Sequence, residues 1–113
     1  MSDTVFGKII AGEIPADKLH EDEHCIVIHD IQPQAPVHVL IIPKKPLENL
    51  SQASAEDQSL LGHLLLVVQK MAEQLSLADG YRVIINNGAG GGQTVYHLHI
   101  HLVGGVVLQE DSL

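Results

Sequence analysis

The chain is poor in cysteine and has no long apolar run, and each shortage excludes a class of protein. Cys25 is the one cysteine among 113 residues, so no disulfide can form within the chain. A lone cysteine fits a reducing compartment. No apolar run reaches the roughly 18 residues of a membrane-spanning helix, and the first residues lack the basic and apolar regions of a signal peptide. We therefore expect a cytoplasmic protein with no membrane partner.

Basic residues are also scarce. Six Lys and Arg stand against 14 Asp and Glu, a formal net charge of −8. A general nucleic-acid binder needs a basic surface that neutralises phosphates, so we expect no nucleic-acid polymer as a partner. A small anion can still bind where backbone N–H groups and imidazoles attract it against the overall field.

The pattern of apolar residues predicts one α+β domain spanning residues 1–113. The length suits a single domain, and 45% hydrophobic residues suit a packed core. Helices are expected over residues 4–11 and 54–77. Strands are expected over residues 25–30, 38–42, 81–86 and 95–103. Because the first two strands are joined by a short Pro-rich turn, we expect an antiparallel sheet.

The long predicted helix is apolar around more than one face. Its main apolar stripe contains Leu60, Leu61, Leu64, Val68, Met71 and Leu75. Leu65, Leu66 and Val67 widen that stripe. A helix so apolar needs a second surface on which to bury itself, so we predict a homodimer packed partly on it. Deep burial of the helix within one domain is the alternative.

Three of the eight histidines alternate with apolar residues near the C-terminus. The segment is Tyr96-His97-Leu98-His99-Ile100-His101-Leu102-Val103. Alternation is the period of a β-strand, so the three imidazoles are expected on one face and the apolar side chains on the other. The result is a row of titratable rings on a rigid element.

Two chemistries suit such a row. Metal binding requires all ligand atoms to converge on one point, which three residues along one strand do poorly. Cys25 has no Cys-x-x-Cys partner, so we expect no metal. Attack on phosphorus suits the row better, because a neutral imidazole is a nucleophile and a protonated one binds phosphate oxygens. The central ring would form a phosphohistidine, and no cofactor is needed.

The residues before the histidines are rich in groups that bind anions. Gly88 to Gly92 has four glycines in five residues, and such a loop can turn several backbone N–H groups toward one anion. Asn86, Gln93 and Thr94 add side-chain donors. An ordinary hairpin connection would explain the glycines alone, but their position next to the histidines favours a phosphate site.

With these motifs in place, the sequence resembles the histidine triad (HIT) superfamily. The segment over residues 91–105 is similar to the superfamily signature, and the segments over residues 6–16 and 29–45 are similar to its Hint branch. The resemblance extends from Val5 to Gly105. It implies a five-stranded antiparallel sheet with two helices, and a homodimer whose two sheets form one of ten strands.

The resemblance also implies an activity and a set of site residues. Hint proteins hydrolyse the P–N bond of purine nucleoside phosphoramidates, such as adenosine 5′-phosphoramidate, and release the nucleoside monophosphate. His99 corresponds to the nucleophile, and the residues around the phosphate correspond to His97, His101 and His38. Phosphate contacts correspond to Asn86, Gln93 and Thr94, and the acid that binds the ribose hydroxyls to Asp30. The pocket for the base corresponds to Val5, Phe6, Ile9, Ile14, Ile28 and His29.

Other features of the chain match no functional position or depart from the pattern. His20, His24 and His63 match none, and we interpret them as surface or structural residues. Thr94 stands where many Hint proteins have serine, and Ile28 replaces an aromatic residue. Three alternatives remain open: a nucleotide-binding or scaffolding protein with incidental catalysis, a dinucleoside polyphosphate hydrolase, and a metal-binding protein.

Overall fold

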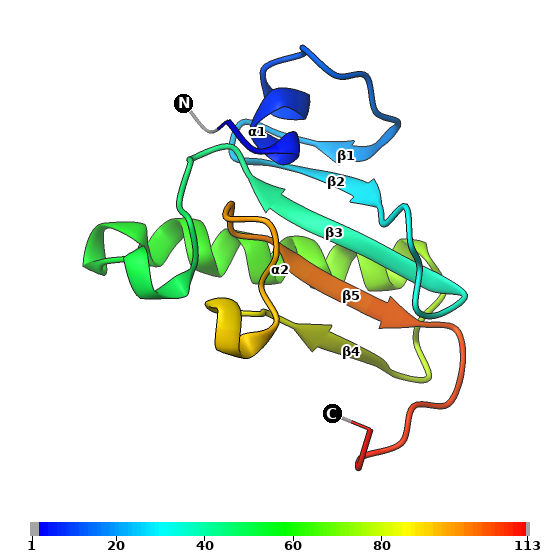
Figure 1. Ribbon diagram of the computed structural model, residues 1–113. Helices are drawn as coiled ribbons and strands as arrows, with labels where there is room; N and C mark the ends of the chain where they lie inside the picture. Colours follow the sequence, from blue (N-terminus) through cyan, green and yellow to red (C-terminus); the bar gives the residue numbers. More distant parts are fainter. Residues whose placement is uncertain (1–2, 113) are drawn as a thin grey trace.

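The fold is built on a five-stranded antiparallel sheet flanked by two α-helices (Figure 1). A computed structural model describes residues 3–112. The strand order is β1-β2-β3-β5-β4. The strands are β1 (Lys18–Glu21), β2 (Cys25–His29), β3 (Val37–Pro43), β4 (Tyr81–Ile84) and β5 (Ile100–Gly104). The α+β class and the sheet implied by the HIT resemblance are confirmed.

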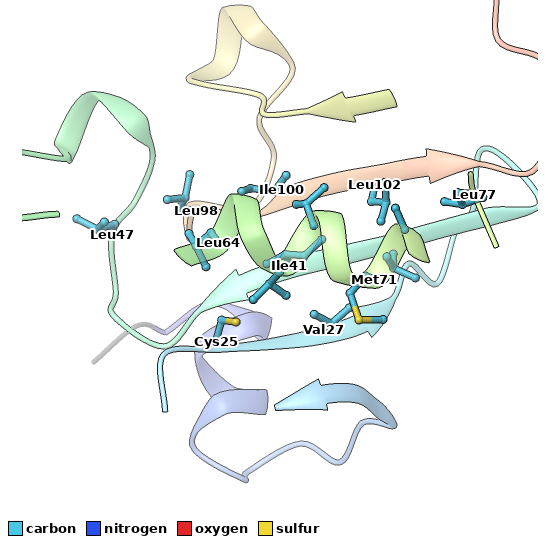
Figure 2. Close-up of a cluster of buried hydrophobic side chains, with 14 residues drawn as sticks. Cys25, Val27, Ile41, Leu47, Leu64, Met71, Leu77, Leu98, Ile100 and Leu102 are labelled. Atoms are coloured by element: carbon cyan, nitrogen blue, oxygen red, sulfur yellow. The ribbon is translucent and has the colours of Figure 1, made fainter. Parts of the chain in front are cut away.

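Helix α2 (Gln58–Gln74) covers one face of the sheet. Its buried side chains, among them Leu64, Val68 and Met71, pack against alternate residues of the central strands (Figure 2). The sheet contributes Val27, Val39, Ile41, Ile100 and Leu102. Period-two alternation along each strand sends these side chains to α2 and their neighbours to the opposite face.

The predicted long helix is confirmed, although its first turn differs. Ser54 does cap a helical segment, but that segment is a 3₁₀ turn over Ala55–Asp57, and α2 follows it. Leu65 and Leu66 point away from the core, with 52% and 69% of their surfaces exposed. The helix therefore buries one stripe and leaves an apolar edge in solvent.

Helix α1 (Val5–Ile10) begins at Thr4, whose Oγ1 accepts a hydrogen bond from the N–H of Gly7 at 3.1 Å. The chain leaves α1 through Gly12, at φ +80°. A second apolar cluster joins α1 to the sheet face opposite α2. It contains Phe6, Ile9, Ile26, Ile28, Leu40 and Ile42.

The histidine segment is where the predicted and observed strands differ most. The strand expected over residues 95–103 starts only at Ile100. Pro43, at the end of β3, has no N–H with which to continue the ladder, and the N–H of Leu98 instead donates to Leu47 O at 2.7 Å. The alternation persists nonetheless, because Leu98, Ile100 and Leu102 all join the α2-side core.

Two smaller differences concern the sheet edges. Strand β4 ends at Ile84, two residues before the predicted end. Strand β1 is not among the four strands predicted from the apolar pattern, because its mostly exposed residues show no apolar alternation. It is the fifth strand that the HIT resemblance implies. Within residues 3–112, no helix is both long and apolar enough to cross a membrane.

Candidate active site

His38 and His101 lie on neighbouring strands, and their rings meet on the face opposite α2. In the register of β3 and β5, His38 is opposite Val103 and Leu40 is opposite His101. Nε2 of His38 lies 2.9 Å from Nδ1 of His101. Nδ1 of His38 accepts from the N–H of Gln34 at 3.0 Å, so the His38 proton is on Nε2. His38 therefore donates to His101, which leaves the proton of neutral His101 on its own Nε2.

Asp30 stands beside this histidine pair, directly after β2. Its Oδ2 is 3.4 Å from Nε2 of His38 and 4.0 Å from Nδ1 of His101. Its Oδ1 accepts from the N–H of Gln32 at 2.8 Å, which fixes the orientation of the carboxylate. The HIT resemblance implies that Asp30 binds the ribose. Nothing in the sequence motif indicates that its carboxylate also lies next to His38.

His97 and His99 precede β5, and backbone carbonyls orient both rings. Nε2 of His97 donates to Pro43 O, and Nδ1 of His99 donates to His97 O, each at 2.8 Å. A carbonyl can only accept, so these nitrogens carry the protons. In the neutral ring of His99, Nε2 therefore keeps its lone pair, as a nucleophile requires.

The environment keeps two of the rings neutral at pH 7. Burial, together with the positive charges that His99 and His38 can carry, lowers the pKa of His101 to about 4. Burial also lowers the pKa of His97 below its ordinary value, against the hydrogen bond to Pro43 O. The ring of His101 lies 5.0 Å from that of His99, between centroids. A nucleophile with a free lone pair and a neutral N–H donor thus stand side by side.

Apolar side chains predicted for the base pocket gather next to these rings. Phe6 packs edge-on against His99, with ring centroids 4.9 Å apart. Phe6, Ile9 and Ile28 belong to the cluster beneath α1, and Ile14 packs against it. Val5 is exposed on α1, whereas His29 is exposed at the end of β2, where it pairs with Val39 and its side chain turns toward the α2 face. These contacts place the apolar residues together without testing whether they hold a base.

Gln93 is buried, and its side chain ties loops together. The amide nitrogen donates to Glu48 O at 2.7 Å and to Val95 O at 3.0 Å, while Oε1 accepts from the N–H of Gly88 at 2.8 Å. Asn86 donates to Gly91 O at 2.8 Å. Thr94 is exposed. Phosphate contact by Asn86, Gln93 and Thr94 stays a prediction.

The glycine-rich loop does not form the anion cradle expected from its composition. The N–H groups of Gly91, Gly92 and Gln93 donate to carbonyls of the same loop. Gly88 and Gly92 adopt positive φ angles of 76° and 85°, which lets the chain close on itself. Its glycines thus serve a compact turn whose N–H groups are largely used internally.

The groups that set the histidine protons could not be found from side-chain motifs. The Gln34 N–H group, Pro43 O and His97 O are backbone atoms, which any residue type supplies.

Asp30, His38 and His101 have ligand atoms within 4.8 Å of one another, close enough to hold a cation as well. A cavity of about 640 Å³ lies elsewhere, between β4 and the segment after β5, and none of these histidines lines it.

Comparison with known proteins agrees with this geometry. Residues 11–107 match the HIT domain. The chain is 62% identical over 103 residues to an uncharacterized HIT-like protein of Synechococcus elongatus, covering 91% of this chain and 90% of that protein.

Solved structures extend the likeness to the whole fold. A HIT family hydrolase from Clostridium thermocellum superposes with a TM-score of 0.95 at 44% identity, covering 100% of this chain and 99% of that one. A histidine triad nucleotide-binding protein from Candida albicans gives a TM-score of 0.81 at 40% identity, covering 88% and 73%. With its sheet, its four clustered histidines and this sequence identity, the chain belongs to the HIT domain family.

Proposed function

We propose that this protein binds purine nucleotides and hydrolyses the P–N bond of nucleoside 5′-phosphoramidates through a nucleotidyl-His99 intermediate. The observation that carries the proposal is the orientation of His99. Its Nδ1–H is bound to His97 O at 2.8 Å, so the lone pair of Nε2 is available next to the neutral ring of His101. The names of the structural relatives, a HIT family hydrolase and a nucleotide-binding protein, support the same class.

The first step forms one bond and breaks one. Nε2 of His99 attacks phosphorus, the P–N bond of the substrate breaks, and the leaving nitrogen takes a proton. Solvent supplies that proton, because a neutral His101 has only one ring proton; its Nε2–H, which is free because Nδ1 faces the donor His38, can instead donate a hydrogen bond to a phosphoryl oxygen. The products of this step are a free amine and the nucleotidyl-histidine.

The second step restores the enzyme. A water molecule attacks phosphorus, loses its proton to solvent, and displaces Nε2 of His99 to release the nucleoside monophosphate. His38 and Asp30 hold the ring of His101 in place throughout. His97 is 1% exposed and positions His99 through its backbone carbonyl.

The nucleoside would lie over the α1 side of the site. Phe6, Ile9 and Ile28 already form one apolar surface there, with Ile14 packed against it and Val5 on the same helix; His29, at the end of β2, would contact the base only from the edge of this surface. Asp30 uses Oδ1 for the Gln32 N–H group, and Oδ2 faces the histidines. A carboxylate has about four acceptor positions, so Asp30 can still accept from ribose hydroxyls. The phosphate would lie along Asn86, Gln93 and Thr94. The side-chain amide of Gln93 would give up one hydrogen bond to a backbone carbonyl and donate to a phosphate oxygen instead.

The proposal also includes a homodimer. Leu65 and Leu66 are exposed next to one another on α2, an apolar edge that a second copy would cover. The face carrying the histidines is opposite α2, so such a contact leaves the nucleotide site open.

The direct test is AMP release from adenosine 5′-phosphoramidate by the wild type and by His99→Ala. We expect the substitution to lower kcat by at least about a thousandfold, because it removes the attacking atom. Binding of AMP, measured by calorimetry, should change little. Equal turnover by the two proteins would contradict the proposal.

A further inference from the structure

A second group of metal-ligating side chains lies at the turn between β1 and β2. His20 is in β1, Asp22 is in the turn, Cys25 starts β2, and His63 is on α2. Oδ2 of Asp22 lies 2.8 Å from Nε2 of His20 and 2.8 Å from Nε2 of His63. The thiol of Cys25 donates to the same oxygen at 3.5 Å. Two nitrogens and a sulfur from three elements thus converge on one carboxylate.

The Asp22 carboxylate is fixed and ionised. Its Oδ1 accepts from the N–H groups of His24 and Cys25 at 2.7 and 2.9 Å. Burial alone would raise the pKa of Asp22, but hydrogen bonds from His20, the His24 N–H group and His63 hold it well below its usual range. The turn therefore presents an oriented anion between two imidazoles.

The spacing suits a single small cation. The ligand atoms of His20, Asp22 and Cys25 lie within 4.8 Å of one another. Around one tetrahedral zinc ion, ligand atoms are separated by about 3.3–3.8 Å, given bonds of about 2.0–2.3 Å. Small side-chain rotations would close that difference for these three ligand atoms, and His63, whose Nε2 is 2.8 Å from Oδ2 of Asp22, can approach as the fourth ligand.

Burial gives the group an inner and an outer side. Cys25 is fully buried at the edge of the α2-side core (Figure 2). Burial, with the nearby Asp22 charge, raises its pKa to about 12, so the sulfur is a thiol until a cation displaces the proton. The side chains of His20 and His63 are 17% and 35% exposed, which leaves an entry path from solvent.

We propose that His20, Asp22, Cys25 and His63 form a binding site for one divalent transition-metal ion, with zinc the best match to this set of N, O and S donors. The bound ion joins the β1–β2 turn to α2. No metal-ligand spacing is visible along the chain, because His63 is 38 positions from Cys25 and meets Asp22 only through the packing of α2 on the sheet.

Calorimetric titration of the chelator-treated full-length protein with Zn²⁺ tests the proposal. We expect one ion per chain for the wild type and an affinity at least about tenfold weaker for His20→Gln and His63→Gln. His101→Gln is the matched control, because it disrupts the separate group of Asp30, His38 and His101, and it should bind like the wild type. No stoichiometric binding, or binding lost in the control and kept in His20→Gln, would overturn the proposal.

Cobalt substitution tests the sulfur ligand in the wild type itself. Co²⁺ bound to the wild type should give a thiolate-to-cobalt absorption band in the near ultraviolet, and Cys25→Ser should lack it. Zn²⁺ should also raise the Tm of the wild type, and raise that of His63→Gln by less at the same concentration. A Co²⁺ complex of the wild type with no thiolate band would refute the four-ligand site.

Discussion

The protons of the four clustered histidines are set by fixed acceptors and donors. His99 is bound through Nδ1 to a carbonyl, and His38 through Nδ1 to an N–H group, so these two rings hold opposite tautomers. Such fixed partners decide which nitrogen attacks and which one donates. In our proposal, the reaction depends on this arrangement more than on the net charge of the site.

The neutral state of His101 predicts a fall in stability with acid. Its pKa is about 4 in the folded protein against about 6.5 when unfolded. At a pH between these two pKa values, the unfolded state therefore binds more protons than the folded state. The free energy of unfolding consequently decreases as the pH falls from 6.5 toward 4. For the wild type we expect about 1–2 kcal/mol of this loss between pH 7 and 5 to come from His101.

Urea unfolding of His101→Gln at pH 7, 6 and 5 measures that contribution. The variant cannot take up the proton, so its free energy of unfolding should fall less steeply over this interval. Parallel pH profiles for the two proteins would show that His101 is not held neutral.

Asp30 allows a test of the ribose contact. We expect Asp30→Ala to bind AMP about tenfold more weakly, because a charged acceptor of hydroxyl protons is lost. The same substitution should hardly change binding of 2′,3′-dideoxy-AMP, which has no hydroxyls to donate. Calorimetry with both ligands separates a ribose contact from a general change in the site, which would weaken both equally.

At the level of elements, the sequence predicted the alternation of the histidine segment better than its strand boundaries. Side-chain periodicity identified the face of Leu98, Ile100 and Leu102 correctly. The start of β5 at Ile100 depends on where β3 ends and on the carbonyl of Leu47, which is 51 positions from Leu98. Such partners cannot be read from local pattern, and the exposed strand β1 has no apolar pattern to read.

The start of the α2 region depends on Ser54, whose Oγ accepts from the N–H of Glu56 at 3.3 Å. We expect Ser54→Ala to lower the free energy of unfolding by about 1 kcal/mol, because a capping acceptor is lost. Ser59→Ala is the matched control, since Ser59 is exposed inside α2 and alanine favours a helix. Chemical denaturation should show destabilisation only for Ser54→Ala, and an equal loss in both would reject the cap.

At the scale of the whole molecule, α2 has a buried side and an exposed apolar edge. If a second copy covers that edge, the double variant Leu65→Glu with Leu66→Glu should separate the dimer, because four charges would enter an apolar contact. Sedimentation at micromolar concentration should give about twice the chain mass of 12.2 kDa for the wild type and one chain for the variant.

Ile31→Glu is the control for that experiment, because Ile31 is 95% exposed and lies outside α2. It should sediment as the wild type does. A wild type that sediments as one chain at these concentrations would contradict the dimer.

Attack of His99 on phosphorus can be seen directly by trapping the covalent intermediate. The wild type and His99→Ala are mixed with adenosine 5′-phosphoramidate, or with an analogue whose intermediate breaks down slowly, quenched rapidly and weighed intact by mass spectrometry. We expect a covalent adduct of one nucleotidyl group on the wild type, mapped to His99 and absent from the variant. An adduct on another residue, or AMP release by the variant at the wild-type rate, would contradict attack by His99.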